Sequence, residues 1–242
     1  MTAIWLDRIT AVPSVSLTFK PWFRSREAFV SALEPVFLEW DAAGEGLVFK
    51  DLGPLGLRIE VSTGHTIDID LTSVRLSFSP NADVVWDTSG RPQIQHPEVV
   101  VYTAALAAMT RRAAGVLSPL LQNRARPCTR AVIGADCLVP ADAPPPGLAS
   151  WLESLRKAWR GKELAVGGQS VTALGEAAGQ KDRARHRVSW GGEKAAFELH
   201  VDWQRHYDPP SPLSVGDVKA RLDEWSAIAS GYFEHFGVDF DG

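Results

Sequence analysis

The chain has 242 residues, of which 45% are hydrophobic and 22% charged, and its formal net charge is −4. These proportions are typical of a soluble globular protein. The negative net charge argues against a protein that binds nucleic-acid backbone over its whole surface, because such proteins carry an excess of Lys and Arg. No apolar run reaches the roughly 20 residues of a membrane-spanning helix. We therefore expect a cytoplasmic protein that does not contact a membrane.

The first half of the chain mixes strand and helix patterns. Alternating apolar residues predict a strand over 14–20. Apolar steps of three and four predict a helix over 26–40, which Pro35 should kink or split. Residues 81–97, which are polar and contain prolines, are expected to form a loop before a long helix over 98–122. Further short strands are predicted at 47–49, 57–61, 67–71 and 74–78.

The second half shows a comparable order of patterns. A strand is predicted over 129–139, a helix over 147–159 and a short strand near 169–173. Two longer strands follow, and the last helix runs from Ser214 to about Phe236. The two halves therefore each read as β-α-β-β-β-α.

Those two longer strands, over 183–190 and 194–207, are expected to form a hairpin. Gly191 and Gly192 tolerate the positive φ that a tight turn needs, so they are the predicted turn. The prolines after residue 207 should end the second strand. This register pairs Arg185 with Glu198 and Arg183 with His200.

Helical stripes recur between the halves. The stripe Phe29, Leu33, Val36, Trp40 recurs as Leu148, Leu152, Leu155, Trp159. The stripe Tyr102, Leu106, Met109, Ala113, Val116, Leu120 recurs as Val218, Leu222, Trp225, Ala229, Tyr232, Phe236. We predict an α+β fold of two similar halves, 1–125 and 126–242, related by a pseudo-twofold axis. Each half would pack its helices on one face of an antiparallel sheet, and the halves would form one compact unit.

The chain lacks the common local motifs of catalysis. It has no phosphate-binding glycine loop, no His-Glu-x-x-His, no paired Cys-x-x-Cys and no nucleophile elbow. No cofactor is predicted. The absence of these motifs lowers the expectation of an enzyme, although a site assembled from scattered residues would leave no such signature.

Polar residues alternating along two predicted strands form the best constellation for a site. Asp68 and Asp70 share one strand face, and His200 and Asp202 hold the corresponding positions in the second half. Such carboxylates and imidazole are candidate ligands for a divalent metal if they converge. A solvated sheet face explains the same alternation, and we favour that interpretation.

Two features are candidates for contact with a partner. Arg183, Arg185 and Arg187 alternate along one predicted strand face and would form a basic patch for an acidic protein or for nucleic acid. Pairing with nearby acidic residues is an equally good explanation. Trp22 lies near a turn, where an exposed Trp can anchor an interface. Packing over the end of a sheet is the alternative for Trp22, and we favour it.

The layout resembles one known group of sequences. The relevant residues are the ending Leu199-His-Val-Asp-Trp203 followed by a long helix that closes on Tyr232-Phe233-Glu-His-Phe236. With the early strand and helix and the central long helix, this layout resembles a sporadically distributed family of uncharacterised bacterial proteins of similar length. The resemblance implies a layout only and transfers no site residue.

Three functions are consistent with the sequence. The first is a non-enzymatic protein-binding or regulatory adaptor of a bacterial multi-gene system for defence, toxin neutralisation or secretion. The second is a metal-dependent hydrolase or nuclease-like enzyme that uses Asp68, Asp70, His200 and Asp202. The third is a small-ligand sensor with a pocket between the halves. We expect the first, because the chain lacks catalytic motifs and is rich in aromatic residues.

Overall fold

The computed structural model describes residues 10–21, 23–78, 83–86, 92–95, 101–121, 124–140, 150, 153, 165–191 and 196–235. The elements in chain order are β1 (Thr10–Phe19), α1 (Arg26–Ala42), β2 (Leu47–Asp51), β3 (Leu57–Val61), β4 (His65–Ile69), β5 (Ser73–Phe78), β6 (Asp83–Trp86), β7 (Pro92–Gln95), α2 (Tyr102–Leu121), β8 (Arg126–Pro140), β9 (Ala165–Ala177), β10 (Gln180–Gly191), β11 (Ala196–Leu213) and α4 (Val215–His235).

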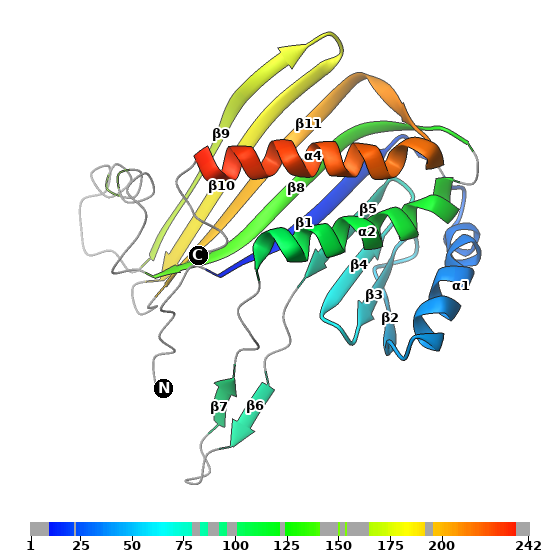
Figure 1. Ribbon diagram of the computed structural model, residues 1–242, viewed down its shortest axis with the longest axis horizontal. Coiled ribbons are helices and arrows are strands. Elements are labelled where there is room, and N and C mark those ends of the chain that lie inside the picture. The colour runs from blue at the N-terminus through cyan, green and yellow to red at the C-terminus, as the bar shows by residue number, and fades with distance from the viewer. Residues whose placement is uncertain are drawn as a thin grey trace.

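Nine of the described strands form one antiparallel sheet in the order β2-β3-β4-β5-β1-β8-β11-β10-β9. The predicted α+β class is confirmed, but the separate sheets expected for the halves are a single sheet. Its two halves meet where β1 pairs with β8, from Thr10 opposite Leu138 to Phe19 opposite Cys128. Helices α2 and α4 lie side by side across one face, and α1 lies near the β2 end (Figure 1).

The hydrophobic core lies between the sheet and these helices. One row of directly opposed residues crosses the helix side of the sheet, and all of its members are buried: Ile67, Leu76, Val15, Ile133, Trp203 and Ala184. The rings of Tyr102 in α2 and Phe233 in α4 meet edge to face, with centroids 6.0 Å apart. Each such fully buried large side chain contributes roughly 1.5–3 kcal/mol to folding.

The predicted helical stripes are the faces that α2 and α4 bury. All six residues of the α2 stripe are buried, from Tyr102 to Leu120. In α4 the stripe is buried from Val218 to Ala229, and Phe233 continues it. Phe236 and the predicted helix 147–159 lie outside the part of the chain that can be described, apart from the isolated helical positions 150 and 153.

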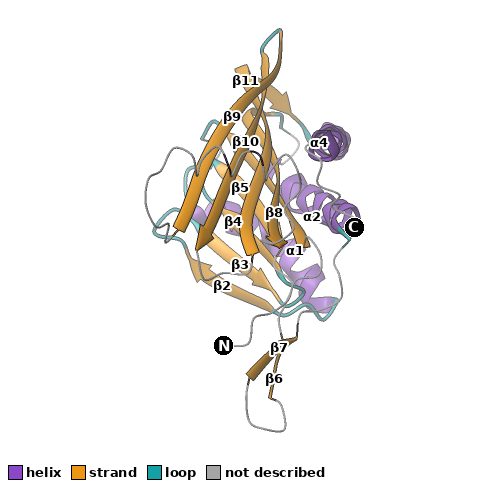
Figure 2. Cartoon of the chain, turned by 90° about the vertical axis from the view of Figure 1, so that its left-hand side faces the viewer, coloured by secondary structure: helices purple, strands orange, loops and turns teal. Residues whose placement is uncertain are grey.

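The opposite side of the sheet, which we name the open face, is covered by none of the described helices (Figure 2). Side chains alternate along a strand, so the residues next to the core positions point to this face. A second row of opposed residues crosses it: Asp68, Arg75, Ser16, Val132, Gln204 and Arg183. The candidate Asp, His and Arg side chains on the strands therefore share this face.

Three local predictions were wrong. The expected loop 81–97 contains the short hairpin β6–β7, because Val84, Val85 and Ile94 favour extended backbone despite the neighbouring prolines. Of the two outcomes predicted for Pro35, a kink or a split, the split is excluded, because α1 continues through this residue. Strand β11 does not end at its prolines: its pairing with β8 lapses after His206 and resumes at Ser211.

The third wrong prediction is the hairpin register. Strand β10 ends at Gly191 and β11 begins at Ala196, so the connection is longer than a two-residue turn. The pairing consequently shifts by four residues, and Arg185 faces Asp202 instead of Glu198. None of the helices in the described residues is both long and apolar enough to cross a membrane.

Candidate functional site

The first predicted carboxylate, Asp68, lies on β4 and binds its neighbour across the strands. Arg58 on β3 donates from Nε to Asp68 Oδ1 at 2.7 Å and from its terminal nitrogen to Oδ2 at 2.8 Å. Both side chains remain partly exposed. Asp68 therefore takes part in a surface ion pair, which occupies both of its oxygens.

The second predicted carboxylate, Asp70, shapes a turn instead of sharing a strand face with Asp68. Its Oδ1 accepts the backbone N–H groups of Thr72 and Ser73 at 2.6 and 2.8 Å. Burial would raise the pKa of Asp70, but these bonds and the hydroxyls of Thr72 and Ser73 outweigh burial and lower it. These bonds form the turn between β4 and β5, which lies between the strands predicted at 67–71 and 74–78.

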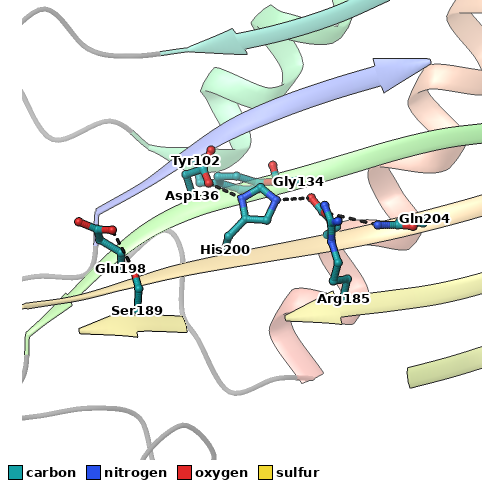
Figure 3. A network of polar contacts seen from close by, with 9 residues as sticks. Tyr102, Gly134, Asp136, Arg185, Ser189, Glu198, His200 and Gln204 are labelled. Carbon is teal, nitrogen blue, oxygen red and sulfur yellow. Dashed lines mark hydrogen bonds and ion pairs between the residues drawn. The ribbon is translucent and has the colours of Figure 1, made fainter. Parts of the chain in front are cut away.

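His200 and Asp202, the other two predicted residues, belong to a polar network on β8, β10 and β11. His200 lies between two carboxylates, with Nδ1 donating to Asp136 and Nε2 donating to Asp202 Oδ1 at 2.8 Å (Figure 3). Both ring nitrogens are therefore occupied. The side chain of His200 is 12% exposed, whereas Asp136 is 47% exposed and forms the outer end of the network.

Asp202 is the buried centre of this network, with 2% of its surface exposed although it points to the open face. Its Oδ2 accepts Nε of Arg185 at 2.9 Å, a second nitrogen of Arg185, and Nε2 of Gln204 at 3.3 Å. Buried carboxylates are stable only when they are paired and hydrogen bonded. Asp202 meets both conditions.

Gly134 makes room for Asp202 in the middle of β8. A Cβ atom at this position would lie 2.7 Å from Asp202 Oδ1 and 2.6 Å from the hydroxyl of Ser14 on β1. Both distances are shorter than real Cβ contacts. Glycine inside a strand often marks such a close approach, and here it lets Asp202 reach down to the sheet backbone.

The charges of this network balance at neutral pH. Burial would lower the pKa of His200, but its hydrogen bonds to Asp136 and Asp202 outweigh burial and raise the pKa to about 9. Burial would raise the pKa of Asp202, but His200 and Arg185 lower it. The network thus holds two carboxylates, one imidazolium and one guanidinium. A charged His200 with both nitrogens donating has no lone pair with which to act as a general base.

The four metal candidates do not come together in the structure. Asp68 on β4 and Asp202 on β11 are separated by β5, β1 and β8, which places their strands roughly 19 Å apart at normal strand spacing. In the described residues, no three His, Cys, Asp or Glu side chains are grouped so as to hold a metal ion.

Asp136, the outer partner of His200, was not predicted from the sequence. The available signal was a lone carboxylate in the apolar stretch 131–139, two residues from Gly134.

The three predicted arginines have different environments. Arg185 is bound by Asp202, as the pairing alternative anticipated. Arg183 and Arg187 are exposed on the open face and form no ion pair with any carboxylate of the described chain. Arg183 also lies near His206, whose pKa is lowered first by burial and then by Arg183 and Arg130. Trp22 lies outside the described residues.

A separate groove lies at the opposite end of the sheet. It has a volume of about 720 Å³ and is lined by residues of α1, β2 and β3, including Glu34, Phe37 and Phe49. This groove belongs to the first half alone. At the sheet, the seam between the halves is the hydrogen-bonded pairing of β1 with β8. The groove is therefore not the pocket between halves that the sensor hypothesis requires.

Comparison with protein-family models, with curated proteins and with solved structures gives no match to this chain.

Proposed function

We propose that this chain is a non-enzymatic protein-binding adaptor that uses the β9–β10 end of its open face. The observation that carries the proposal is that Arg183 and Arg187 are exposed and meet no carboxylate of the described residues, beside a network in which every charge is neutralised. Unpaired arginines are common anchors in protein interfaces, because a planar guanidinium binds carboxylates with two parallel hydrogen bonds. Their natural ligand is an acidic surface or segment.

The chemistry of the network supports binding over catalysis. A catalytic histidine or carboxylate needs a free lone pair or an exchangeable proton near pH 7. His200 donates from both nitrogens, and Asp202 accepts from three side chains. These groups are arranged to hold β8, β11 and β10 in one geometry. They provide a rigid base for the neighbouring arginines.

We further propose a cytoplasmic location, in a bacterial multi-gene system for defence, toxin neutralisation or secretion. Cys128 and Cys137 fit a reducing compartment, since both are buried free thiols. Burial raises the pKa of the Cys128 thiol to about 12 and keeps it protonated and unreactive.

An internal duplication would explain the order of the sheet. Outward from the central pair β1–β8, the neighbours on the two sides are β5 and β11, then β4 and β10, then β3 and β9. Each half also ends with a long helix packed on the same face. We propose that a pseudo-twofold axis passes between β1 and β8. A crystal structure in which superposition of the two halves needs a rotation far from 180° would contradict this duplication.

The adaptor proposal is tested by affinity purification of the full-length chain from its native host, followed by mass spectrometry. The test variant is R183E/R187E. The matched control is R24E/R111E, which makes the same change in net charge at two exposed positions away from β10. We expect one protein to co-purify with the wild type and the control and to be lost from R183E/R187E. If the same proteins are recovered with all three chains, the proposal fails.

A further inference from the structure

We propose that the partner contributes an acidic, extended segment that adds to β9 as a new edge strand. This inference rests on the proposed protein-binding function and names the chemistry of the partner. Its basis is the coincidence of two features at one end of the sheet: within the described residues, β9 is an edge strand with no outer neighbour, and two arginines of the adjacent strand β10 have no acidic partner.

Strand β9 is an open edge. It spans Ala165–Ala177, pairs with β10, and has no second neighbour in the described part of the chain. Val171 is 57% exposed and Leu174 is 39% exposed. The outer backbone N–H and C=O groups of such an edge can pair with another extended chain.

From Ala165 to Ala173 the edge has none of the usual protections, and the register irregularity of β9 against β10 comes only after it, at Leu174. Proteins usually guard edge strands with charges, prolines or short length. β9 has 13 residues, no proline, and one charged residue, Glu176, which binds Lys181 at 3.1 Å. The other edge, β2, has five residues and ends in Lys50 and Asp51, both in ion pairs. The β9 edge is therefore the one suited to strand addition.

The arginines of β10 determine which kind of peptide segment can add to the β9 edge. Arg183 lies opposite Ala173 of β9, and Arg187 lies opposite Gln169. An added strand would lie about 10 Å from β10, two strand spacings away. An arginine side chain extended over the short Ala173 can cover most of that distance and meet a carboxylate on the new strand. Arg185, between them, is already bound by Asp202.

This register predicts a recognition pattern. Positions opposite Gln169 and Ala173 are four residues apart, and their side chains share the open face because strands alternate. Acidic residues at these two positions would meet Arg187 and Arg183. The position midway between them faces Val171 and favours an apolar side chain. The expected segment is acid-x-apolar-x-acid.

A second copy of the chain is a poorer occupant of this edge. If β9 paired antiparallel with β9 of another copy, the strand would offer mostly Gly, Ala, Val, Ser and Thr to the partner's arginines. Glu176, its one acid, already binds Lys181. The positive charge of Arg183 and Arg187 would remain unmatched, so charge complementarity favours an acidic partner.

The experiment measures binding of short synthetic peptides to the full-length protein by fluorescence anisotropy. One peptide carries Glu-Thr-Val-Thr-Glu at its centre, and the other carries Lys-Thr-Val-Thr-Lys. We expect the wild type and R24E/R111E to bind the Glu peptide about tenfold or more tightly than R183E/R187E does, a difference of roughly 1.4 kcal/mol. R183E/R187E should instead prefer the Lys peptide. This reversal of preference cannot result from unfolding.

Two results would overturn the inference. One is equal binding of both peptides, or no binding, by the wild type while the host partner is still lost from R183E/R187E. In that case the adaptor proposal stands and the strand-addition inference fails. The other is a wild-type protein that is dimeric by light scattering and whose β9 amides are already protected from hydrogen exchange without peptide. That result would assign the edge to a second copy.

Discussion

The charged side chains at the two ends of the sheet are arranged differently. On β2, β3 and β4, the Lys, Arg, Asp and Glu side chains pair with one another or with α1 at the surface, as in Lys50 with Glu60 and Arg58 with Asp68. Near β9, Asp136, His200 and Arg185 form one network around the buried Asp202, and Arg183 and Arg187 have no acidic partner among the described residues. Surface pairs contribute little to stability, whereas a buried network fixes strand positions and can present spare charges to a ligand. This difference is the reason for proposing the binding site at the β9 end.

The largest expected effect contrasts the two aspartates. Asp202→Ala leaves Arg185 without its carboxylate and His200 with Asp136 alone, so it should lower the free energy of unfolding by about 3 kcal/mol, the lower end of the range for buried pairs because Arg185 is 41% exposed. Asp68→Ala should lower it by less than about 1 kcal/mol, because the Arg58–Asp68 pair is partly exposed. Urea denaturation measures both. Equal losses would contradict the division between a buried and a surface site.

The next effect contrasts two histidines in their pH dependence. His200 has a folded pKa of about 9, above the ordinary 6.5. The folded state therefore holds the proton more tightly, and this stabilisation is complete below pH 6.5 and lost as the pH rises to 9. The change is roughly 3 kcal/mol. In His200→Gln this alkaline loss should disappear from a series of urea titrations.

His65 should show the opposite behaviour. Burial and then the charge of Arg112 lower the pKa of His65 to about 4. The unfolded chain then binds the proton more tightly, so the contribution of His65 is complete above pH 6.5 and lost as the pH falls toward 4. His65→Gln should flatten the acidic side of the stability profile only. If His65→Gln changes the alkaline part of the stability profile, or His200→Gln changes the acidic part, the assignment of each part to its histidine is wrong.

A smaller effect contrasts two glycines. Gly134→Ala forces a methyl group against Ser14 and Asp202 and should lower stability by about 1–3 kcal/mol. Gly115, inside α2, has no neighbouring atom within 4 Å of an added Cβ. Gly115→Ala should therefore raise stability by about 0.5–1 kcal/mol. Thermal unfolding measures both shifts. A tolerated alanine at position 134 would mean that Asp202 does not lie against the β8 backbone.

The smallest stability effect is expected at the arginines assigned to the partner. Arg183 and Arg187 have no ion pair within the described chain, so R183E/R187E should change the free energy of unfolding by less than about 0.5 kcal/mol. Circular dichroism and urea denaturation check this. A large loss of stability would show that these arginines support the fold itself.

The positions of the strands and helices could be predicted from the sequence more accurately than the pairing of the strands. Period-two and helical apolar patterns located β1 and the long helices α2 and α4, because burial against one face imposes those periods. The pairing of β1 with β8 joins segments far apart in the chain, and local apolar patterns do not indicate which distant strands pair. The β10–β11 register was missed because Gly191-Gly192 matches a tight turn, although the strands end further apart.

The candidate site was predicted in its residues but not in its arrangement. Alternation placed His200, Asp202 and Arg185 on one exposed face, and the structure confirms that face. Their burial depends on Asp136 and Gly134 from β8, which only the three-dimensional pairing brings beside them. The role of Asp70 depends on turn geometry, for which strand alternation carries no information.

Hydrogen exchange of the β9 backbone tests the central claim most directly. The full-length protein is followed by mass spectrometry with and without saturating Glu-Thr-Val-Thr-Glu peptide. We predict that amides within Ala165–Ala177 become protected on binding, while those of β2 at the opposite edge do not change. R183E/R187E should show no protection with this peptide. Unchanged β9 exchange in a saturated wild-type complex would contradict strand addition at this edge.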